Sequence, residues 1–333
     1  MNKIAVLGAG AWGTALARLL AERGPVVLWT WRAEHESALR YERENREFLP
    51  GYALSDQITP TSDLGEAVAD AQVVVIAVPS EAVRATLAAA ASALSADATL
   101  VVVAKGIEPT TLMLLSEVTA DVLGPGADRR AVFLSGPSFA VEVARGLPTN
   151  LVAAGHDAER SRLVQQRFAS DRLRVYSSDD PAGVQVGGAL KNVIAIAAGA
   201  SDGLGFGHNT RAALITRGLA EMARLAVAKG GNERTLSGLA GLGDLVLTCS
   251  AELSRNRTVG FELGRGRQLA EVLSGLGHVA EGVTTADSAH HLAERLGVDL
   301  PITSEVHAVL YSDKPVAQAV RDLLARPLKK EWE

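Results

Sequence analysis

A glycine-rich segment near the beginning of the chain constrains the fold more than any other feature. Gly8, Gly10 and Gly13 directly follow the apolar run Ile4–Leu7 and lie at the start of a helical stretch, Trp12–Glu22. In such a segment the first glycine permits a tight turn, the second lets the backbone approach a pyrophosphate, and the third lets helix and strand pack closely. The helix N-terminus then offers free N–H groups to the phosphates. The pattern predicts a dinucleotide site, with a plain tight turn in an α/β protein as the alternative.

Short apolar runs alternate with helical stretches over the first half of the chain. Most of the runs are continuous, which is typical of strands buried on both faces of a parallel sheet. The expected strands are Ile4–Leu7, Val26–Trp29, Val73–Val78, Leu100–Val103, Val132–Leu134 and Asn150–Ala153, and the expected helices are Trp12–Glu22, Ser80–Leu94 and Thr111–Leu123. This alternation predicts an α/β fold with a Rossmann-like, doubly wound and mostly parallel sheet.

After about Asp180 the strand-like runs give way to long Ala- and Leu-rich stretches. Helices are expected near Val184–Gly199, Thr210–Ala228, Arg267–Leu276, Thr284–Leu296 and Ser304–Leu310. Turn residues at Ser177–Pro181 separate the two patterns. Since 333 residues suit two domains, we expect a dinucleotide-binding Rossmann-like domain over 1–180 and an all-helical substrate domain over 181–333.

Charge, cysteine content and hydropathy argue against several classes of protein, such as nucleic-acid-binding and membrane-spanning proteins. The net charge of −5 gives no general attraction to nucleic acid or to an anionic membrane. Cys249 is the only cysteine, so no intrachain disulfide forms, which fits a reducing compartment. The longest uncharged run, Ile4–Ala17, is shorter than the roughly 20 apolar residues that a membrane span needs. We therefore expect a cytoplasmic protein that acts on a small molecule, with no nucleic-acid partner and no membrane insertion. A homodimer is the working hypothesis for the oligomeric state.

The residues after the second expected strand bear on the choice of nicotinamide cofactor. Sites that prefer NAD usually carry an acidic residue there, which binds the ribose 2′-hydroxyl. The segment Leu28–Arg32 contains no acid, and Arg32 can pair with a 2′-phosphate instead. This favours NADPH (or NADP) over NADH (or NAD), which stays possible. The alternative is that Arg32 is a solvated surface residue.

Lys191 is the first candidate for catalysis. It is the only charged residue between Ala182 and Ser201, where a lysine is costly unless it is paired or used. Partial desolvation would lower its pKa, which suits a proton donor to a carbonyl oxygen. Its alternative role is a surface lysine with a buried stem. Asp244, on a glycine-flanked turn, is placed to pair with Lys191 or a substrate hydroxyl, or simply to cap a helix.

Several further residues are candidates for binding an anionic substrate. The run Ser254, Arg255 and Asn256 combines a hydroxyl, a guanidinium and an amide, which suits a phosphate, although a surface turn fits the run as well. Lys105 follows one expected strand, and the segment from Ser135 to Ser138 follows another, so both are expected at the ligand-binding edge of the sheet unless they form ordinary loops. The histidines show no metal-ligand spacing and no cysteine cluster exists, so we predict no metal.

Taken together and in their order along the chain, the sequence motifs resemble those of the bacterial NAD(P)-dependent glycerol-3-phosphate dehydrogenases. The resemblance extends along nearly the whole chain. The matching segments are Gly8–Ala17, Phe48–Pro50, Ala104–Glu108, Ser135–Val143, Pro148–Thr149, Gly188–Asn192, Glu221–Met222, Gly238–Cys249, Ser254–Asn256 and Glu281–Gly282. The resemblance implies an active site between a Rossmann-like domain and a helical domain. It also implies an oxidoreductase that interconverts dihydroxyacetone phosphate and sn-glycerol 3-phosphate by hydride transfer, supplying glycerophospholipid synthesis.

The resemblance also implies a role for individual residues. Lys191 is expected to be the general acid/base. The implied sugar-phosphate contacts are Lys105, Gly136, Ser138, Lys191, Asp244, Ser254, Arg255 and Asn256. The implied cofactor contacts, beside the glycines, are Trp12, Arg32, Lys105, Ala140, Arg255, Val279 and Glu281. Ala11, also in the cofactor segment, stands where many relatives have serine, so one hydroxyl contact is expected to be missing.

Two other functions remain open on the sequence alone. A Rossmann dehydrogenase with a helical second domain that acts on a hydroxy acid or sugar acid would also need a lysine and a glycine-rich turn. The second alternative is a non-catalytic dinucleotide-binding module, which would keep the glycine turn without needing Lys191.

Overall fold

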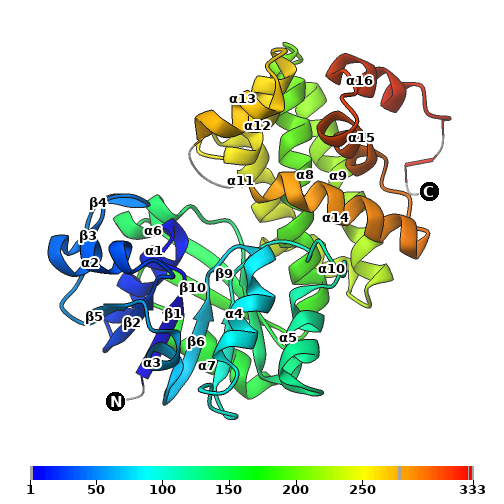
Figure 1. Ribbon diagram of the computed structural model, residues 1–333. Helices are drawn as coiled ribbons and strands as arrows, with labels where there is room; N and C mark the ends of the chain where they lie inside the picture. Colours follow the sequence, from blue (N-terminus) through cyan, green and yellow to red (C-terminus); the bar gives the residue numbers. More distant parts are fainter. Residues whose placement is uncertain (1–2, 277–279, 329, 332–333) are drawn as a thin grey trace.

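An eight-stranded sheet is the centre of the first half of the protein, in a computed structural model that describes residues 3–276, 280–328 and 330–331. The strands are β1 (Lys3–Leu7), β2 (Val26–Trp29), β5 (Ile58–Thr61), β6 (Ala71–Ile76), β7 (Thr99–Val102), β8 (Ala131–Ser135), β9 (Thr149–Ala154) and β10 (Leu173–Ser178). Their order is β10-β9-β8-β7-β6-β1-β2-β5, and every neighbouring pair is parallel except β8 with β9. The predicted doubly wound, mostly parallel sheet is confirmed, and all six predicted strands are present (Figure 1).

Helices cover both faces of this sheet because successive side chains of a strand point to opposite faces. In β1, Ile4 and Val6 pack into one apolar cluster with α1 (Ala11–Ala21) and α7 (Ala158–Phe168). Ala5 and Leu7 pack into another with α3 (Leu64–Val68), α4 (Val83–Ala90) and α5 (Leu115–Leu123). The continuous apolar runs of the sequence are thus explained by burial on both sides.

The strand order reverses beside β1, which is where ligands are expected to bind. The chain passes from β1 outward to β2 and β5, and then returns to β6 on the other side of β1. At such a reversal the connecting segments diverge and leave a crevice at the carboxyl ends of the strands. Gly8 follows β1, Lys105 lies just beyond β7, and Gly136 follows β8, so all three lie at this edge.

The structure adds elements that continuous apolar runs do not reveal. Strand β5 contains Pro60 and lies at one edge of the sheet, whereas β10, at the other edge, alternates buried and exposed residues. A small hairpin, β3 (Glu44–Asn45) with β4 (Leu49–Ala53), and the helices α2 (Ala33–Glu42) and α6 (Ala140–Arg145) were also not predicted. Edge elements are half-solvated, and their hydropathy pattern is correspondingly weak.

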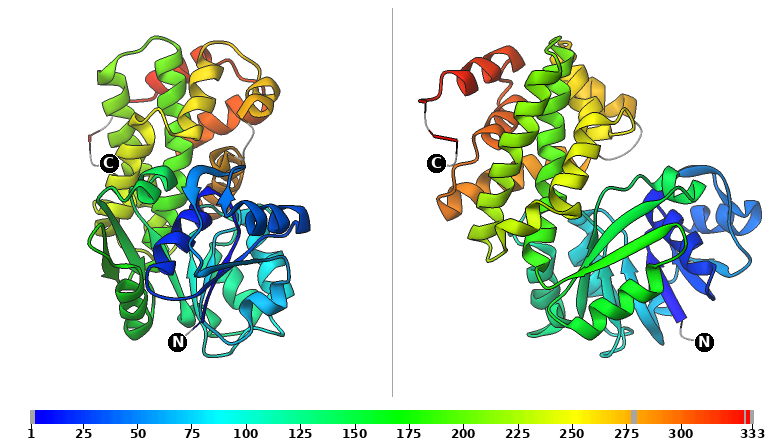
Figure 2. Two further views of the ribbon diagram at one scale, coloured as in Figure 1. Left: turned by 90° about the vertical axis from the view of Figure 1, so that its left-hand side faces the viewer. Right: turned by 180° about the vertical axis from the view of Figure 1, so that it is seen from behind.

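The second half is helical, as predicted, with no strand among its described residues. Its helices are α8 (Pro181–Gly203), α9 (His208–Ala228), α10 (Glu233–Leu236), α11 (Asp244–Ser250), α12 (Arg255–Gly264), α13 (Leu269–Leu276), α14 (Glu281–Leu296), α15 (Pro301–Tyr311) and α16 (Val316–Leu324). A short π-helical turn, Leu239–Gly243, leads into α11. These helices gather beyond one edge of the sheet, above it in the views of Figures 1 and 2.

Helix α8 is the core of this helical half. It is long and apolar enough to cross a membrane, but 89% of its most apolar window is buried inside the protein. It crosses α12 very closely, since a Cβ on Gly199 would lie 1.9 Å from the Arg257 carbonyl oxygen and one on Gly260 would lie 1.9 Å from the Ile196 carbonyl oxygen. The apolar character of α8 is therefore that of a central core helix.

Candidate active site

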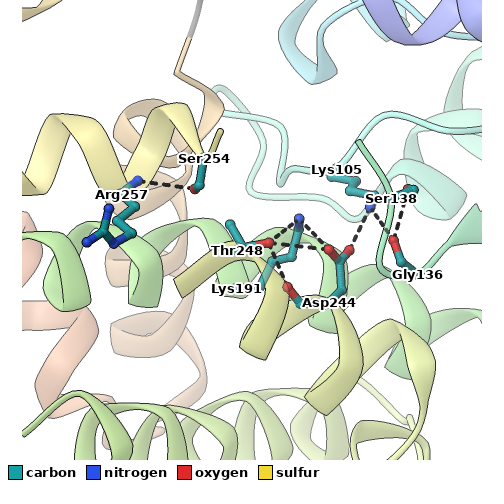
Figure 3. A network of polar contacts seen from close by, with 8 residues as sticks. All are labelled: Lys105, Gly136, Ser138, Lys191, Asp244, Thr248, Ser254 and Arg257. Carbon is teal, nitrogen blue, oxygen red and sulfur yellow. Dashed lines mark hydrogen bonds and ion pairs between the residues drawn. The ribbon is translucent and has the colours of Figure 1, made fainter. Parts of the chain in front are cut away.

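Lys191 lies in the middle of α8 and points to the side that faces the sheet edge (Figure 3). Only 7% of the residue is exposed. Two of the three N–H donors of its ammonium group are used, since Nζ donates to Asp244 Oδ1 at 2.7 Å and to Thr248 Oγ1 at 2.9 Å. The alternative of a lysine that reaches the surface is wrong, because the side chain ends in a buried polar network.

Asp244 joins Lys191 to a second lysine. It is the first residue of α11 and is completely buried. Its other oxygen, Oδ2, accepts a hydrogen bond from Lys105 Nζ at 2.6 Å, and Lys105 Nζ also donates to the Gly136 carbonyl oxygen at 3.2 Å. Lys105 comes from the segment after β7, so Asp244 ties the helical half to the sheet (Figure 3). The predicted pairing of Asp244 with Lys191 is confirmed.

These contacts displace the pKa of both partners. Burial lowers the pKa of Lys191 to about 8, with nearby Lys105 acting in the same direction and Asp244 opposing both. Burial alone would raise the pKa of Asp244, but Lys105 and Lys191 hold it below its usual value. At neutral pH the network therefore contains a carboxylate and a protonated lysine that gives up its proton unusually easily.

Gly136 and Ser138 complete the sheet side of this network. Gly136 has φ +135°, and a Cβ there would lie 3.0 Å from the Asn150 carbonyl oxygen, so the turn after β8 requires glycine. Ser138 Oγ donates to the same Gly136 carbonyl at 3.1 Å. Lys105, Gly136, Ser138, Lys191 and Asp244 are thus brought together from four separate segments.

The glycine turn after β1 has the geometry that a dinucleotide needs. A Cβ on Gly8 would lie 2.7 Å from the Ala77 carbonyl oxygen, and one on Gly13 would lie 1.9 Å from the Gly8 carbonyl oxygen. A Cβ on Gly10 would meet nothing within 4 Å, so the space in front of it is open. No side chain caps the N-terminus of α1. The turn therefore has both the open space and the free backbone N–H groups that a pyrophosphate needs.

Trp12 adds a second sign that a ligand fits beside this turn. Its indole Nε1 is buried and has no hydrogen-bond partner among the described residues. A buried donor without a partner costs free energy unless a ligand or water satisfies it. Ala11 opens α1 next to it, and Ala140 opens α6, which packs beside α1.

The three residues from Ser254 to Asn256 do not all have the same role. Ser254 Oγ caps α12 by accepting from the Arg257 backbone N–H at 3.3 Å, and Asn256 Oδ1 accepts from the Gly282 N–H at 3.0 Å, at the start of α14. The side chain of Arg255, between them, makes no hydrogen bond or ion pair within the described part of the chain. The structure leaves the guanidinium of this run available, while its neighbours fix the helix ends.

Glu281 links Arg255 electrostatically to the lysines. Burial raises the pKa of Glu281, while the charges of Arg255, Lys191 and Lys105 and a hydrogen bond from the Ser80 backbone lower it. Arg255 therefore acts on the same carboxylate as the two lysines of the network. Val279, the other predicted cofactor contact in this region, lies outside the described residues.

Thr248, which accepts a hydrogen bond from Lys191, was not among the residues predicted from the sequence. Its Oγ1 also donates to the Asp244 carbonyl oxygen at 2.6 Å. It lies four residues after Asp244 on α11, so the two side chains share one helix face. This four-residue spacing from Asp244 is the sequence signal that could have identified Thr248.

Two other features lie away from this network. A cavity of about 470 Å³ lies among α8, α9, α15 and α16, lined largely by apolar residues such as Leu214, Val306 and Leu323, but none of the network residues lines it. Asp287, His291 and His307, on α14 and α15, bring three potential ligand atoms within 4.8 Å of one another. The absence of a metal therefore stays a prediction.

Models of one family match both halves of the chain. The N-terminal model of NAD-dependent glycerol-3-phosphate dehydrogenase matches residues 3–161, and the C-terminal model matches residues 180–321. The glycerol-3-phosphate dehydrogenase [NAD(P)+] of Geobacter metallireducens is 53% identical over 331 residues, which is 99% of each chain. The chain belongs to the NAD-dependent glycerol-3-phosphate dehydrogenase family. The resemblance inferred from the motifs is confirmed.

Solved structures of the glycerol-3-phosphate dehydrogenase family share the whole fold. The enzyme of Coxiella burnetii superposes with a TM-score of 0.93 at 40% identity and covers 98% of this chain and 99% of its own. The enzyme of Saccharomyces cerevisiae does so with a TM-score of 0.83 at 26% identity, covering 98% and 99%. The similarity spans both the sheet and the helices that hold Lys191 and Asp244.

Proposed function

We propose that this protein is an NAD(P)-dependent sn-glycerol-3-phosphate dehydrogenase, which interconverts dihydroxyacetone phosphate and sn-glycerol 3-phosphate. The observation that carries the proposal is the buried Lys191–Asp244–Lys105 network at the carboxyl edge of a dinucleotide-binding sheet. Family membership supports the substrate and the cofactor class.

The residues of the network divide the work of the reaction. A reduced nicotinamide cofactor, held by the glycine turn after β1, would supply the hydride that the carbonyl carbon of the substrate accepts. Lys191 holds a proton on Nζ and gives it to the oxygen that gains charge at that moment, a contribution of roughly 10²–10⁴ in rate. Asp244 keeps Lys191 oriented and charged, and Lys105 adds positive charge next to an anionic substrate. In the reverse direction, neutral Lys191 takes the proton from the alcohol.

Residues around this centre would position the substrate and the cofactor. Arg255, with its free guanidinium, would hold the substrate phosphate in a planar fork and so fix the reacting carbon. The backbone around Gly136 and Ser138 would line the sheet side of the substrate, and Glu281 and Trp12 would face the cofactor. The N–H groups at the start of α1, after Gly10, would hold the pyrophosphate.

Three further assignments belong to the same proposal. Residues 1–180 would form the cofactor-binding domain and 181–333 the substrate domain. NADPH would be preferred through Arg32, with NADH as a second cofactor. The enzyme would work in the cytoplasm without membrane insertion, as a homodimer, and its product would supply glycerophospholipid synthesis.

A paired assay tests the function directly. The purified protein is expected to oxidise NADPH, and NADH less efficiently, when dihydroxyacetone phosphate is added. The same assay with 2-keto acids and with sugar acids serves as the control. Activity with the acids alone would contradict the proposed substrate, and cofactor binding without turnover of any substrate would favour a non-catalytic module.

The pH dependence of the reaction is expected to follow Lys191. Since the pKa of Lys191 is lowered to about 8, the acid form is present below that pH and is lost above it. We expect kcat/KM for ketone reduction to fall about tenfold per pH unit above roughly pH 8, and kcat/KM for alcohol oxidation to rise up to that pH. Rates measured in both directions from pH 6 to 10 check this; parallel profiles in the two directions would exclude a single shared acid/base group.

A further inference from the structure

The cofactor-specificity region contains a carboxylate that the local sequence does not suggest. The segment Leu28–Arg32 contains no acid, but Arg32 Nη2 lies 2.7 Å from Glu47 Oε1 and 2.6 Å from Glu47 Oε2. Glu47 comes from the short β3–β4 hairpin, 15 residues further along the chain. The hairpin therefore brings an acid to the position where NAD-binding sites usually have one.

The hairpin is fixed to the glycine turn by a buried polar network. Asn45, which is 1% exposed, donates through Nδ2 to the Ala9 carbonyl oxygen at 2.8 Å and to Thr14 Oγ1 at 2.7 Å. Its Oδ1 accepts from the Phe48 backbone N–H at 3.2 Å and lies 3.2 Å from His35 Nε2. Glu47 stands between two residues of this network, so its place beside Arg32 is set by the fold.

The end of β2 is tied to the same turn. The Gly8 N–H donates to the Trp29 carbonyl oxygen at 3.0 Å, and Arg32 is the N-cap residue of α2 just beyond. We therefore expect the adenosine ribose of a dinucleotide held by this turn to lie near both members of the pair. The side chains of Arg32 and Glu47 are 32% and 45% exposed, so a ligand can reach them.

We propose that Glu47 is a specificity-determining residue that limits the preference for NADPH and gives the enzyme its use of NADH. A 2′-phosphate on Arg32 must compete with the Glu47 carboxylate and stays close to that like charge. A 2′-hydroxyl instead finds an acceptor in the same carboxylate. The inference rests on the proposed function, because it assumes that a nicotinamide dinucleotide binds this turn.

The test measures dissociation constants for NADPH and NADH, without substrate, on the full-length protein and its variants. Glu47→Gln is expected to tighten NADPH binding about threefold to tenfold. This is the size of effect that removing one exposed charge near the 2′-phosphate produces. The affinity for NADH should stay within about twofold, because glutamine keeps an acceptor oxygen. Glu47→Ala should tighten NADPH similarly but weaken NADH, since the acceptor is lost.

Two further variants control for general charge effects. Glu42→Gln removes one charge from the same region, but its partner is Arg46, at 3.4 Å, so both affinities should stay unchanged. Arg32→Ala should weaken NADPH more than NADH. An unchanged NADPH affinity in Glu47→Gln, or an equal gain for both cofactors, would overturn the inference while leaving the proposed function intact. A parent protein that binds neither cofactor would overturn both.

Discussion

Replacing Lys191 by alanine is expected to lower turnover of dihydroxyacetone phosphate by about 100-fold or more, within the range of general acid–base catalysis. The variant loses the proton that Lys191 gives to the substrate oxygen, and no other group in the network replaces it, because Lys105 is held by Asp244 and Gly136. Affinity for NADPH should stay near that of the parent, since Lys191 lies on α8 and the glycine turn lies at β1. Steady-state kinetics and cofactor titration together check both parts.

Two matched variants make this result specific. Lys191→Met keeps much of the buried length without the charge, and it should lose as much activity as the alanine variant. Lys229→Ala removes another largely buried lysine, which pairs with Glu117 at 2.6 Å, and should leave turnover unchanged. If Lys191→Ala and Lys229→Ala had the same small effect, Lys191 would have no part in the chemistry.

Replacing Asp244 by asparagine is expected to change activity, pH profile and stability together. Asp244 raises the pKa of Lys191 against the effect of burial, so without it that pKa drops below about 8. Less of the acid form then remains at neutral pH, and the descending limb of ketone reduction should move to lower pH. Removing one partner of a buried ion pair also costs about 3–5 kcal/mol in the free energy of unfolding, although the remaining Lys191 can lose its proton to reduce that cost.

The stability loss of Asp244→Asn should itself depend on pH. A lysine whose pKa is lower in the folded than in the unfolded state leaves the folded protein with fewer bound protons, so stability rises with pH. The destabilisation should therefore shrink as pH rises to about 8, where Lys191 of the parent also loses its proton, and stay constant above that pH. Denaturant unfolding of the variant and the parent at pH 6 and pH 9 measures this difference.

Asp202 provides the control for this variant. It is also a buried carboxylate between two cations, Arg211 at 2.8 Å and Arg257 at 2.7 Å, but it lies at the far end of α8. Asp202→Asn should destabilise the protein without moving the pH profile. An identical pH profile for Asp244→Asn and the parent would show that Asp244 does not set the proton affinity of Lys191.

The sheet and the catalytic pair were predictable because their signals are local. Continuous apolar runs mark strands that are buried on both faces, and a single lysine in an apolar helix must find a partner. Asp244 was the acidic residue considered for that partner, and the pair exists at 2.7 Å. The edge strand β10 was missed because it alternates buried and exposed residues, and β5 was missed because its four residues include Pro60 and two threonines and form no apolar run.

Other contacts between distant segments could not be predicted from the sequence. Lys105 and Asp244 are 139 residues apart, and only the packing of the helices onto the sheet edge joins them. The hairpin that places Glu47 beside Arg32 has strands of two and five residues without an apolar pattern. The run Ser254–Asn256 was treated as one phosphate-binding unit, whereas its outer side chains stabilise the starts of α12 and α14.

A crystal structure with NADP and dihydroxyacetone phosphate bound would test the central claim most directly. We expect Lys191 Nζ within about 2.6–3.2 Å of the oxygen on the reacting carbon, as a general acid requires, with Arg255 on the phosphate and the nicotinamide facing that carbon. A substrate held elsewhere, with Lys191 still bonded only to Asp244 and Thr248 and remote from the nicotinamide, would contradict the account.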